Sequence, residues 1–326
     1  MKTIFKTLTL AAAIGISATA NALTVGFAQV GSESGWRTSF SESVKAEAEK
    51  RGITLKFSDA QQKQENQIKA VRSFIAQRVD AILIAPVVET GWQPVLMEAK
   101  RARIPVVILD RNVSVTDQSL YLTRIAPDFE VEGQRAASWL TEKTQGKCKI
   151  LELQGTVGSS AAIGRMKGFT ETISKFPETK IVRSQTAEFT RAKGKEVMET
   201  MLKAEGGGKG ICAIWAHNDE MALGAIQAVR EAGLQPGKDI LIVSVDAVDD
   251  ALKSIVAGEI NVSVELSPHL GGPAFDVINE YRAGKKDFEK CHITPLCFQY
   301  LPTHSRYAEN TFMHGKSTFE NVGNIF

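Results

Sequence analysis

The strongest constraint on the fold is a repeated order of apolar runs and amphipathic segments that begins near residue 23. The amphipathic segments place apolar residues three or four positions apart, which is typical of helices with one buried face. The first half predicts strands at 23–27, 53–57, 80–86 and 104–109, and helices after residue 35, at 64–76 and at 93–103. The strand runs are continuously apolar, which indicates strands buried on both faces in a parallel sheet covered by helices.

The same order repeats in the second half of the chain. It predicts strands at 149–153, 181–185, 211–215 and 240–245, and helices at 165–174, 192–204 and 220–232. Two like halves predict an α/β protein with two similar domains, each a doubly wound parallel sheet flanked by helices with strand order 2-1-3-4-5. Ligands of such sheets bind outside the carboxyl ends of the strands, so the loops there should carry the functional residues.

The first 22 residues differ from the rest of the chain. Lys2 and Lys6 precede an apolar run at 8–16, and Ala20-Asn21-Ala22 supplies the small residues of a cleavage site. This pattern predicts a secretory signal peptide cut after Ala22, because the apolar run is shorter than the ~20 residues that span a bilayer. The alternative reading is a buried N-terminal helix. Without this segment the 39 basic residues fall to 37, which equals the 37 acidic ones. This balance predicts no nucleic-acid or membrane-surface partner.

The four cysteines all follow the expected cleavage site. Cys148 and Cys212 begin the first and third strands of the second half, which are neighbours in the order 2-1-3-4-5, so export and geometry together predict a disulfide between them. Cys291 and Cys297 are a weaker candidate pair because strand geometry does not force it. No cysteine pair or histidine pair has zinc-site spacing, so we expect no metal.

Polar side chains follow the apolar strands in both halves. The candidate ligand-binding residues chosen on this ground are Glu33, Trp36, Arg37, Asp110, Arg111, Arg165, Asn218, Asp246 and Glu265. Sugar hydroxyls both donate and accept hydrogen bonds, so charged and amide side chains can pair with them, while an aromatic ring such as Trp36 stacks on the apolar face of the sugar. This set of residues favours a sugar site.

Structural roles compete with ligand binding at several of these positions. Asp110 and Arg111 could form an ion pair between the two domains, and Glu33 and Arg37 could be solvated. Asn218 and Asp219 could both cap the following helix, with capping favoured for Asp219 and ligand contact for Asn218. His217 is expected to be structural.

Enzyme motifs are weak in this sequence. Gly315-Lys316-Ser317 ends like a phosphate-binding loop, but Asn310 stands where its leading glycine is needed. A glycosidase could use two of Asp110, Asp246 and Glu265. The neighbouring arginines are expected to keep these carboxylates ionised, which suits binding more than acid catalysis. We therefore expect no enzyme and no cofactor.

Taken together, these residues resemble the ribose-type sugar-binding proteins of ABC importers, over nearly all of residues 23–302. The resemblance rests on the signal-peptide pattern, Asp110-Arg111, the spaced set Gly158, Arg165, Gly168 and Phe169, His-Asn-Asp at 217–219 and Ser-Val-Asp at 244–246. The segments 30–37, 61–74 and 152–158 are most similar to the galactofuranose-binding members of the family.

The resemblance implies a two-lobed periplasmic-binding-protein (Venus flytrap) fold crossed three times by the chain, near Arg124, Glu265 and Lys290. It divides the chain into a signal peptide (1–22), an N-terminal lobe (23–124 plus 266–290) and a C-terminal lobe (125–265 plus 291–326). It implies ligand contacts from Asp110, Arg111, Arg165, Asn218 and Asp246, with Trp36 and Arg37 from the galactofuranose-type loop. Ribose-type relatives have Gln where this chain has Glu265, six residues before Gly271, so a ligand other than ribose is expected.

The implied function is reversible capture of a monosaccharide, galactofuranose above all, by a periplasmic monomer that delivers it to the membrane permease of an ABC importer. Presentation of the ligand to a chemoreceptor or sensor kinase is the alternative that the sequence leaves open. A carbohydrate hydrolase is a third reading. The segment after Leu301 does not match the family pattern and has no assigned role.

Overall fold

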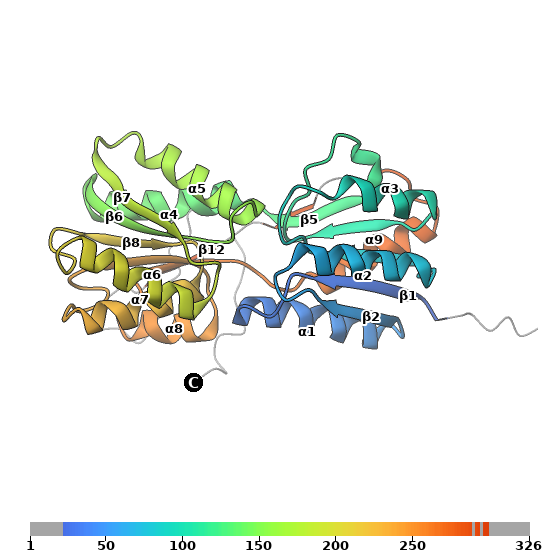
Figure 1. Ribbon diagram of the computed structural model, residues 1–326, viewed down its shortest axis with the longest axis horizontal. Coiled ribbons are helices and arrows are strands. Elements are labelled where there is room, and N and C mark those ends of the chain that lie inside the picture. Colours follow the sequence, from blue (N-terminus) through green and yellow to red (C-terminus); the bar gives the residue numbers. More distant parts are fainter. Residues whose placement is uncertain (1–21, 289–290, 294–295, 300–326) are drawn as a thin grey trace, which may run out of the picture.

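The computed structural model describes residues 22–288, 291–293 and 296–299, and these form two lobes side by side along the long axis of the molecule (Figure 1). The expected signal peptide and the segment after Leu301 lie outside the described residues. None of the helices in the described part of the chain has the length and apolar character needed to cross a bilayer.

Each lobe is built on one six-stranded sheet. The strands of the first sheet are all parallel and lie in the order β11 (Cys291–Ile293), β5 (Thr123–Pro127), β4 (Val106–Leu109), β3 (Ala81–Ile84), β1 (Thr24–Gln29) and β2 (Thr54–Asp59). Four of them, β1, β3, β4 and β5, are almost wholly buried, as continuous apolar runs predict.

The second sheet repeats this order. Its strands are β12 (Leu296–Gln299), β10 (Val262–Glu265), β9 (Leu241–Asp246), β8 (Ala213–Ala216), β6 (Lys147–Gln154) and β7 (Glu178–Thr186), of which only β12 is antiparallel to its neighbour. The predicted order 2-1-3-4-5 is confirmed as β2-β1-β3-β4-β5 and as β7-β6-β8-β9-β10.

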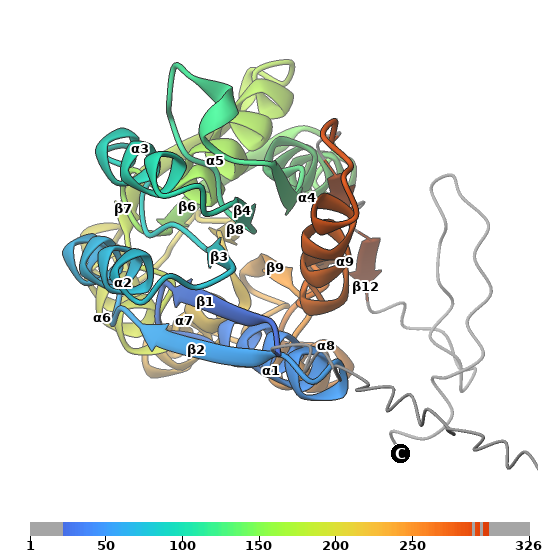
Figure 2. The ribbon, with the colours of Figure 1, turned by 90° about the vertical axis from the view of Figure 1, so that its right-hand side faces the viewer.

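Helices cover both faces of each sheet (Figures 1 and 2). The first lobe has α1 (Gly35–Lys50), α2 (Gln64–Ala76), α3 (Gln93–Arg101), α9 (Gly271–Arg282) and a short 3₁₀ turn at Gln118–Leu120. The second lobe has α4 (Phe129–Lys143), α5 (Ser160–Ile173), α6 (Arg191–Ala204), α7 (Asp219–Glu231) and α8 (Asp249–Val256). The apolar core lies between these helices and the sheets.

The chain passes between the sheets after β5, after β10 and between β11 and β12. The short strand β11 pairs with β5 at the edge of the first sheet, so the sequence analysis was wrong to place residues 291–293 with the second lobe. The reason is that three residues are too few to show a strand periodicity, and their place is fixed by the free edge of β5.

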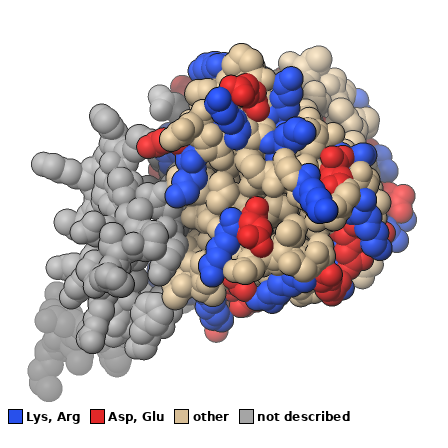
Figure 3. Space-filling view, turned by 90° about the vertical axis from the view of Figure 1, so that its left-hand side faces the viewer, with Lys and Arg blue, Asp and Glu red and all other residues tan. Residues whose placement is uncertain are grey.

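The predicted disulfide between Cys148 and Cys212 is confirmed, with 5.4 Å between the two Cα atoms. Cys148 lies in β6 and Cys212 directly precedes β8, and these strands are neighbours. Acidic and basic side chains are interspersed on the free end of the second lobe (Figure 3), in line with the even charge balance of the chain after residue 22.

Candidate functional site

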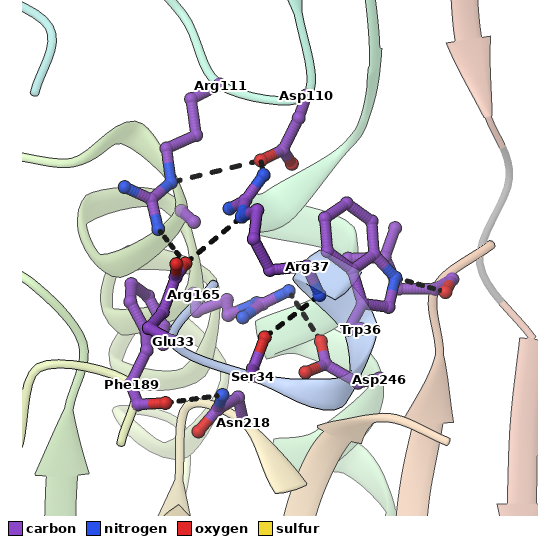
Figure 4. A pocket seen from close by; sticks show the side chains of 12 residues that line it. Glu33, Ser34, Trp36, Arg37, Asp110, Arg111, Arg165, Phe189, Asn218 and Asp246 are labelled. Atoms are coloured by element: carbon purple, nitrogen blue, oxygen red, sulfur yellow. Dashed lines mark hydrogen bonds and ion pairs between the residues drawn. The ribbon is translucent and has the colours of Figure 1, made fainter. Parts of the chain in front are cut away.

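The strand ends of both lobes meet at a small, tightly lined pocket (Figure 4). The lining side chains come from the carboxyl ends of the strands and from the loops and first helical turns that follow them, after β1 and β4 in the first lobe and after β6 to β10 in the second. They are Glu33, Ser34, Trp36, Arg37, Asp110, Arg111, Ala161, Arg165, Phe189, Asn218, Asp246 and Leu266. Eight of the nine residues named as candidates from the sequence are in this set, and Glu265 is not.

Four charged side chains of the first lobe form a closed cluster, which we call the charge ring: Glu33, Arg37, Asp110 and Arg111. Arg37 donates from Nε to Glu33 Oε1 over 3.0 Å and from Nη1 to Asp110 Oδ2 over 2.7 Å. Arg111 lies on the opposite side of the same two oxygens, at 3.8 and 3.9 Å. All four side chains are at most 4% exposed.

The position of the charge ring rules out two of the alternative readings. Glu33 and Arg37 are buried and paired, so they are not solvated surface residues. Asp110 and Arg111 both lie in the first lobe, so their contact does not join the two lobes. The ring is complete without any residue of the second lobe, and it therefore presents a preassembled charged wall to the pocket.

Arg37 and Arg111 differ in how well they are neutralised. Burial would lower the pKa of Arg37, but Asp110 and Glu33 outweigh it and the pKa is raised. Burial, with the nearby charge of Arg37, lowers the pKa of Arg111 to about 10. Within the described part of the chain, Arg111 Nε and Glu33 Oε2 are buried without a hydrogen-bond partner. Unpaired buried groups of this kind are costly, so a hydroxyl that donates to one and accepts from the other would be strongly held.

Arg165 dominates the wall that the second lobe contributes. Its Nε donates to Glu132 Oε2 over 2.7 Å, its Nη1 donates to the carbonyl oxygen of His217 over 2.5 Å, and its Nη2 lies 3.6 Å from Asp246 Oδ1. These contacts fix the guanidinium at the pocket. Burial alone would lower the pKa of Arg165, but the negative charges of Glu132 and Asp246 outweigh burial and raise this pKa.

Asp246 departs from one expectation of the sequence analysis. Burial raises its pKa well above the usual value despite the opposing charge of Arg165, and Asp219 adds to the rise. The arginines therefore oppose the effect of burial on Asp246 without outweighing it, which the sequence does not reveal because it does not show how completely this carboxyl is removed from water. Asp110 and Asp246 also share a left-handed backbone, with φ of 60° and 121°, a strained conformation that is common at functional sites.

Asn218 caps α7, and Asp219 does not. Asn218 Oδ1 accepts from the backbone N–H of Met221, and its Nδ2 donates to the carbonyl oxygen of Phe189. Asp219 instead accepts from the hydroxyl groups of Ser244 and Ser263. The sequence analysis had favoured capping for Asp219; both residue types cap well, and only the backbone decides which of them precedes the helix.

Two aromatic side chains border the pocket. Trp36 donates from its indole N–H to the carbonyl oxygen of Leu266, over 2.6 Å, so it is tied to the segment that leads from the second lobe back to the first. Phe189 lies under two guanidinium groups, with Arg111 at 5.1 Å and Arg165 at 5.9 Å from the ring centre. Cation–π contact of this kind favours the charged arginines.

The sequence analysis missed Phe189, although a signal was present. Phe189 lies three residues after the end of β7, in one of the strand-end loops where ligands bind. The other lining residues that were missed are Ser34, Ala161 and Leu266. Ser34 caps α1 by accepting from the N–H of Arg37, and such a capping role does not distinguish it from other helix starts.

His217 is buried behind the pocket, and its Nε2 lies 3.1 Å from Glu152 Oε1. Burial lowers its pKa. It does not line the pocket. The described residues contain no group of three or more histidine, cysteine, aspartate or glutamate side chains arranged to hold a metal ion.

Comparison with known proteins places the chain in a family. The model of the periplasmic binding protein domain matches residues 25–286. The galactofuranose-binding protein YtfQ of Escherichia coli (strain K12) is 58% identical over 292 residues, which cover 89% of this chain and 92% of that protein.

Solved structures agree with this assignment. The periplasmic binding protein component of the arabinose ABC transporter from Shewanella sp. ANA-3, bound to α- and β-L-arabinofuranose, is 68% identical with a TM-score of 0.82, over 85% of this chain and 91% of that chain. A protein of Mycobacterium smegmatis in complex with β-D-fucofuranose is 47% identical with a TM-score of 0.83, over the same shares. By sequence and by fold, this chain belongs to the periplasmic binding protein family.

Proposed function

We propose that this protein is the solute-binding component of an ABC sugar importer and that it captures a monosaccharide in the furanose ring form in the pocket between its lobes. The observation that carries the proposal is the pair of buried groups in the charge ring that lack a hydrogen-bond partner among the described residues, Glu33 Oε2 and Arg111 Nε. They match the ability of a sugar hydroxyl to donate and accept at once. The pocket combines charged and amide side chains with the aromatic rings of Trp36 and Phe189, a lining that suits a hydroxyl-rich sugar.

The furanose form is favoured by the relatives with high identity. Their structures and names give galactofuranose, L-arabinofuranose and β-D-fucofuranose as ligands, which share a five-membered ring. Galactofuranose and L-arabinofuranose are therefore the two leading ligands for this chain. They differ in the length of the carbon chain that the ring carries.

The proposed ligand contacts come from both lobes. The charge ring and Trp36 would bind from the first lobe, and Arg165, Asn218, Asp246 and Phe189 would bind from the second. Because these side chains meet only when the lobes lie together, ligand binding would favour the closed form over an open one by its higher affinity for the closed form. We propose that the lobes are 23–124 plus 266–290 and 125–265 plus the remainder of the chain, with β11 added to the first.

Calorimetry tests the sugar assignment. Galactose, L-arabinose and D-fucose, whose solutions contain the furanose forms, are titrated into the protein, with ribose as comparison. Hydrogen bonds to charged groups are worth ~1.5–3 kcal/mol each, so the sugar that fits should bind with a dissociation constant of micromolar or less. Ribose should bind at least tenfold more weakly. Absence of heat with all four sugars would contradict the proposal.

We infer that the pocket binds sugar without hydrolysing it. In the charge ring, Asp110 is held by Arg37 at 2.7 Å, which leaves it poorly placed to give a proton to a leaving group. An aryl galactofuranoside should release no aryl alcohol on incubation with the protein. Steady release at a rate proportional to protein concentration would favour a hydrolase instead.

Export to the periplasm is proposed from the first 22 residues. N-terminal sequencing of the protein from a periplasmic extract should begin at Leu23. A sequence that begins at Met1 would contradict the cleavage. The protein would act there as a monomer that docks on a membrane permease, and loss of uptake of the sugar in a deletion strain would separate this role from signalling.

A further inference from the structure

Within the described ranges of the chain, three backbone N–H groups of the first lobe donate to the second lobe outside the residues that line the pocket. Gly35 N–H donates to Glu220 Oε1 over 3.3 Å, Asn112 N–H donates to Ser160 Oγ over 2.8 Å, and Glu89 N–H donates to the carbonyl oxygen of Gly158 over 3.0 Å. The donor belongs to the first lobe and the acceptor to the second lobe in each pair. We call these three contacts the interlobe latch.

The contact of Glu220 joins two helix starts. Gly35 is the first residue of α1, so its N–H has no acceptor within the helix. Glu220 lies in the first turn of α7 in the other lobe. Its carboxylate is therefore placed at the positive end of a helix across the boundary, where negative charge is stabilising. Arg191 donates to the second oxygen of Glu220 over 2.7 Å, which holds the carboxylate in place before the lobes meet.

The other two contacts lie together at the start of α5. Ser160 is the first residue of that helix and is 7% exposed, and Gly158 precedes it by two residues. On the side of the first lobe, the loops that carry Glu89 and Asn112 are themselves joined, because Ser114 N–H donates to the carbonyl oxygen of Glu89 over 2.7 Å. Two linked loops thus dock on one helix start. In Figure 1, one end of α5 approaches the boundary between the lobes in the upper part of the view, and one end of α1 approaches it in the lower part.

We propose that Ser160 and Glu220 are positioning residues, which set the affinity for sugar by stabilising the closed form without touching the ligand. This rests on the proposed function, in which the lobes open and close around the pocket. Neither residue lines the pocket. The latch contacts exist only when the lobes lie together, so they favour closure in the presence and in the absence of ligand.

The proposal predicts how affinity responds. The apparent dissociation constant equals the intrinsic one divided by the fraction of protein in the binding-competent form. Loss of one neutral or partly exposed hydrogen bond should therefore lower the closing equilibrium constant about two- to tenfold in Ser160→Ala and in Glu220→Ala, and raise the apparent dissociation constant by up to that factor. Glu220→Gln keeps an oxygen that accepts from Gly35 and should restore part of the affinity.

Matched controls separate the latch from general effects of substitution. Glu231→Ala removes a carboxylate from the same helix as Glu220, but this one is 57% exposed and pairs with Lys195 within the second lobe. Ser138→Ala removes a hydroxyl on α4 that donates only to the carbonyl oxygen of Gln134. Both control variants should bind sugar like the wild type.

Hydrogen–deuterium exchange of the ligand-free protein is the decisive readout. Removing an acceptor speeds exchange of the N–H group that donated to it, whether or not the lobes open. The test is therefore the exchange rate at the latch contact that was not mutated. Glu220→Ala should speed exchange at Asn112 and Glu89, and Ser160→Ala should speed exchange at Gly35, because each substitution lowers the closed fraction. Saturating L-arabinose or galactose should remove both effects.

Two results separate the latch from the proposed function. Exchange that changes only at the mutated contact, with unchanged sugar affinity, would overturn the latch and leave the sugar assignment standing. Failure of the wild type to bind any sugar would overturn the sugar assignment, while a cross-effect on exchange between the two contacts would still support the latch.

Discussion

Arg37 is the side chain that joins the two carboxylates of the first lobe. A guanidinium can donate in two directions from one rigid plane, and here Nε serves Glu33 while Nη1 serves Asp110. The ammonium group of a lysine is a single point of charge and cannot reproduce both bonds. The geometry of the charge ring therefore depends on arginine at this position and not on positive charge alone.

Arg37→Lys should weaken sugar binding about 10- to 100-fold, which corresponds to the loss of one hydrogen bond between charged groups. Calorimetry with L-arabinose or galactose measures the change. Arg51→Lys is the matched control, because Arg51 also bridges two carboxylates, those of Glu47 and Asp276, but on the surface and away from the pocket. Equal affinity in the wild type and in Arg37→Lys would contradict the role given to the charge ring.

Glu132 illustrates a different consequence of burial at the residue scale. It accepts from Arg165, yet burial raises its pKa to about 7, and its Oε1 has no hydrogen-bond partner among the described residues. The carboxyl group of Glu132 therefore binds its proton more tightly in the folded chain than in the unfolded chain. The contribution of Glu132 to the free energy of unfolding is fully present below pH 4.5 and is lost as the pH rises through about 7.

Glu132→Gln should remove that pH dependence. Urea titrations at pH 5 and pH 7.5 give the free energy of unfolding, and the wild type should lose about 2 kcal/mol more than the variant between the two values. Glu130→Gln is the control on the same helix, since Glu130 is 43% exposed. An identical pH response in the wild type and in Glu132→Gln would show that Glu132 is ionised throughout.

The sequence predicted the types of residue at the site better than their contacts. Strand ends are visible as polar residues after apolar runs, which is why eight lining residues were found in advance. The partners of Arg165 were not visible, because Glu132 lies 33 positions away on another helix. Glu265 was named because it follows an apolar run, but that position along the chain does not determine which side of a strand faces the pocket.

At the scale of elements, glycines determine how closely the helices of the second lobe pack. An added Cβ at Gly168 in α5 would lie 1.9 Å from the carbonyl oxygen of Glu130 near the start of α4, and one at Gly133 in α4 would lie 2.2 Å from that of Arg165. The two helices thus approach backbone to backbone on the side that carries Arg165. This gives a physical reason for the glycine at 168 in the motif of the sequence analysis.

Gly168→Ala should lower the free energy of unfolding by about 1–3 kcal/mol, because the backbone of α4 must move away. Gly272→Ala is the matched control in α9, where the nearest atom to an added Cβ is 3.9 Å away. There alanine should be neutral or stabilise by about 0.5–1 kcal/mol, as expected for glycine replaced within a helix. Urea unfolding of both variants checks the prediction, and equal stabilities would contradict it.

The disulfide ties two neighbouring strands of the second sheet. It closes a loop with a sequence separation of 64 residues, and the loss of loop entropy in the unfolded chain predicts a stabilisation of about 3–4 kcal/mol. The double substitution of Cys148 and Cys212 by serine should lower the free energy of unfolding by that amount. A loss below about 1 kcal/mol would mean that the disulfide adds little to a sheet that is already formed.

Most of the elements were predictable from the pattern alone. The helix Gln64–Ala76 begins and ends where its periodicity does, and the other expected strands and helices differ mainly by a few residues at their ends. The exceptions are the strand β5, the helices α4, α8 and α9, and the two short strands near the end of the described chain. The short strands β11 and β12 were not predicted, because their positions are determined by the open edges of β5 and β10.

At the scale of the whole molecule, the account depends on two lobes that share one pocket. The sequence predicted the two halves because each carries its own βα order, and it predicted which end of each sheet is functional. It did not predict the latch contacts. Gly35, Glu89 and Asn112 contribute backbone N–H groups, which every residue except proline possesses, so no residue type could signal them.

A crystal structure of the protein grown with L-arabinose or galactose tests the central claim most directly. The account predicts electron density for a five-membered sugar ring in the pocket, with hydroxyl groups within 3.2 Å of Glu33 Oε2 and Arg111 Nε. A six-membered ring there would contradict the furanose assignment. Density for the sugar only outside the twelve lining residues would contradict the pocket itself.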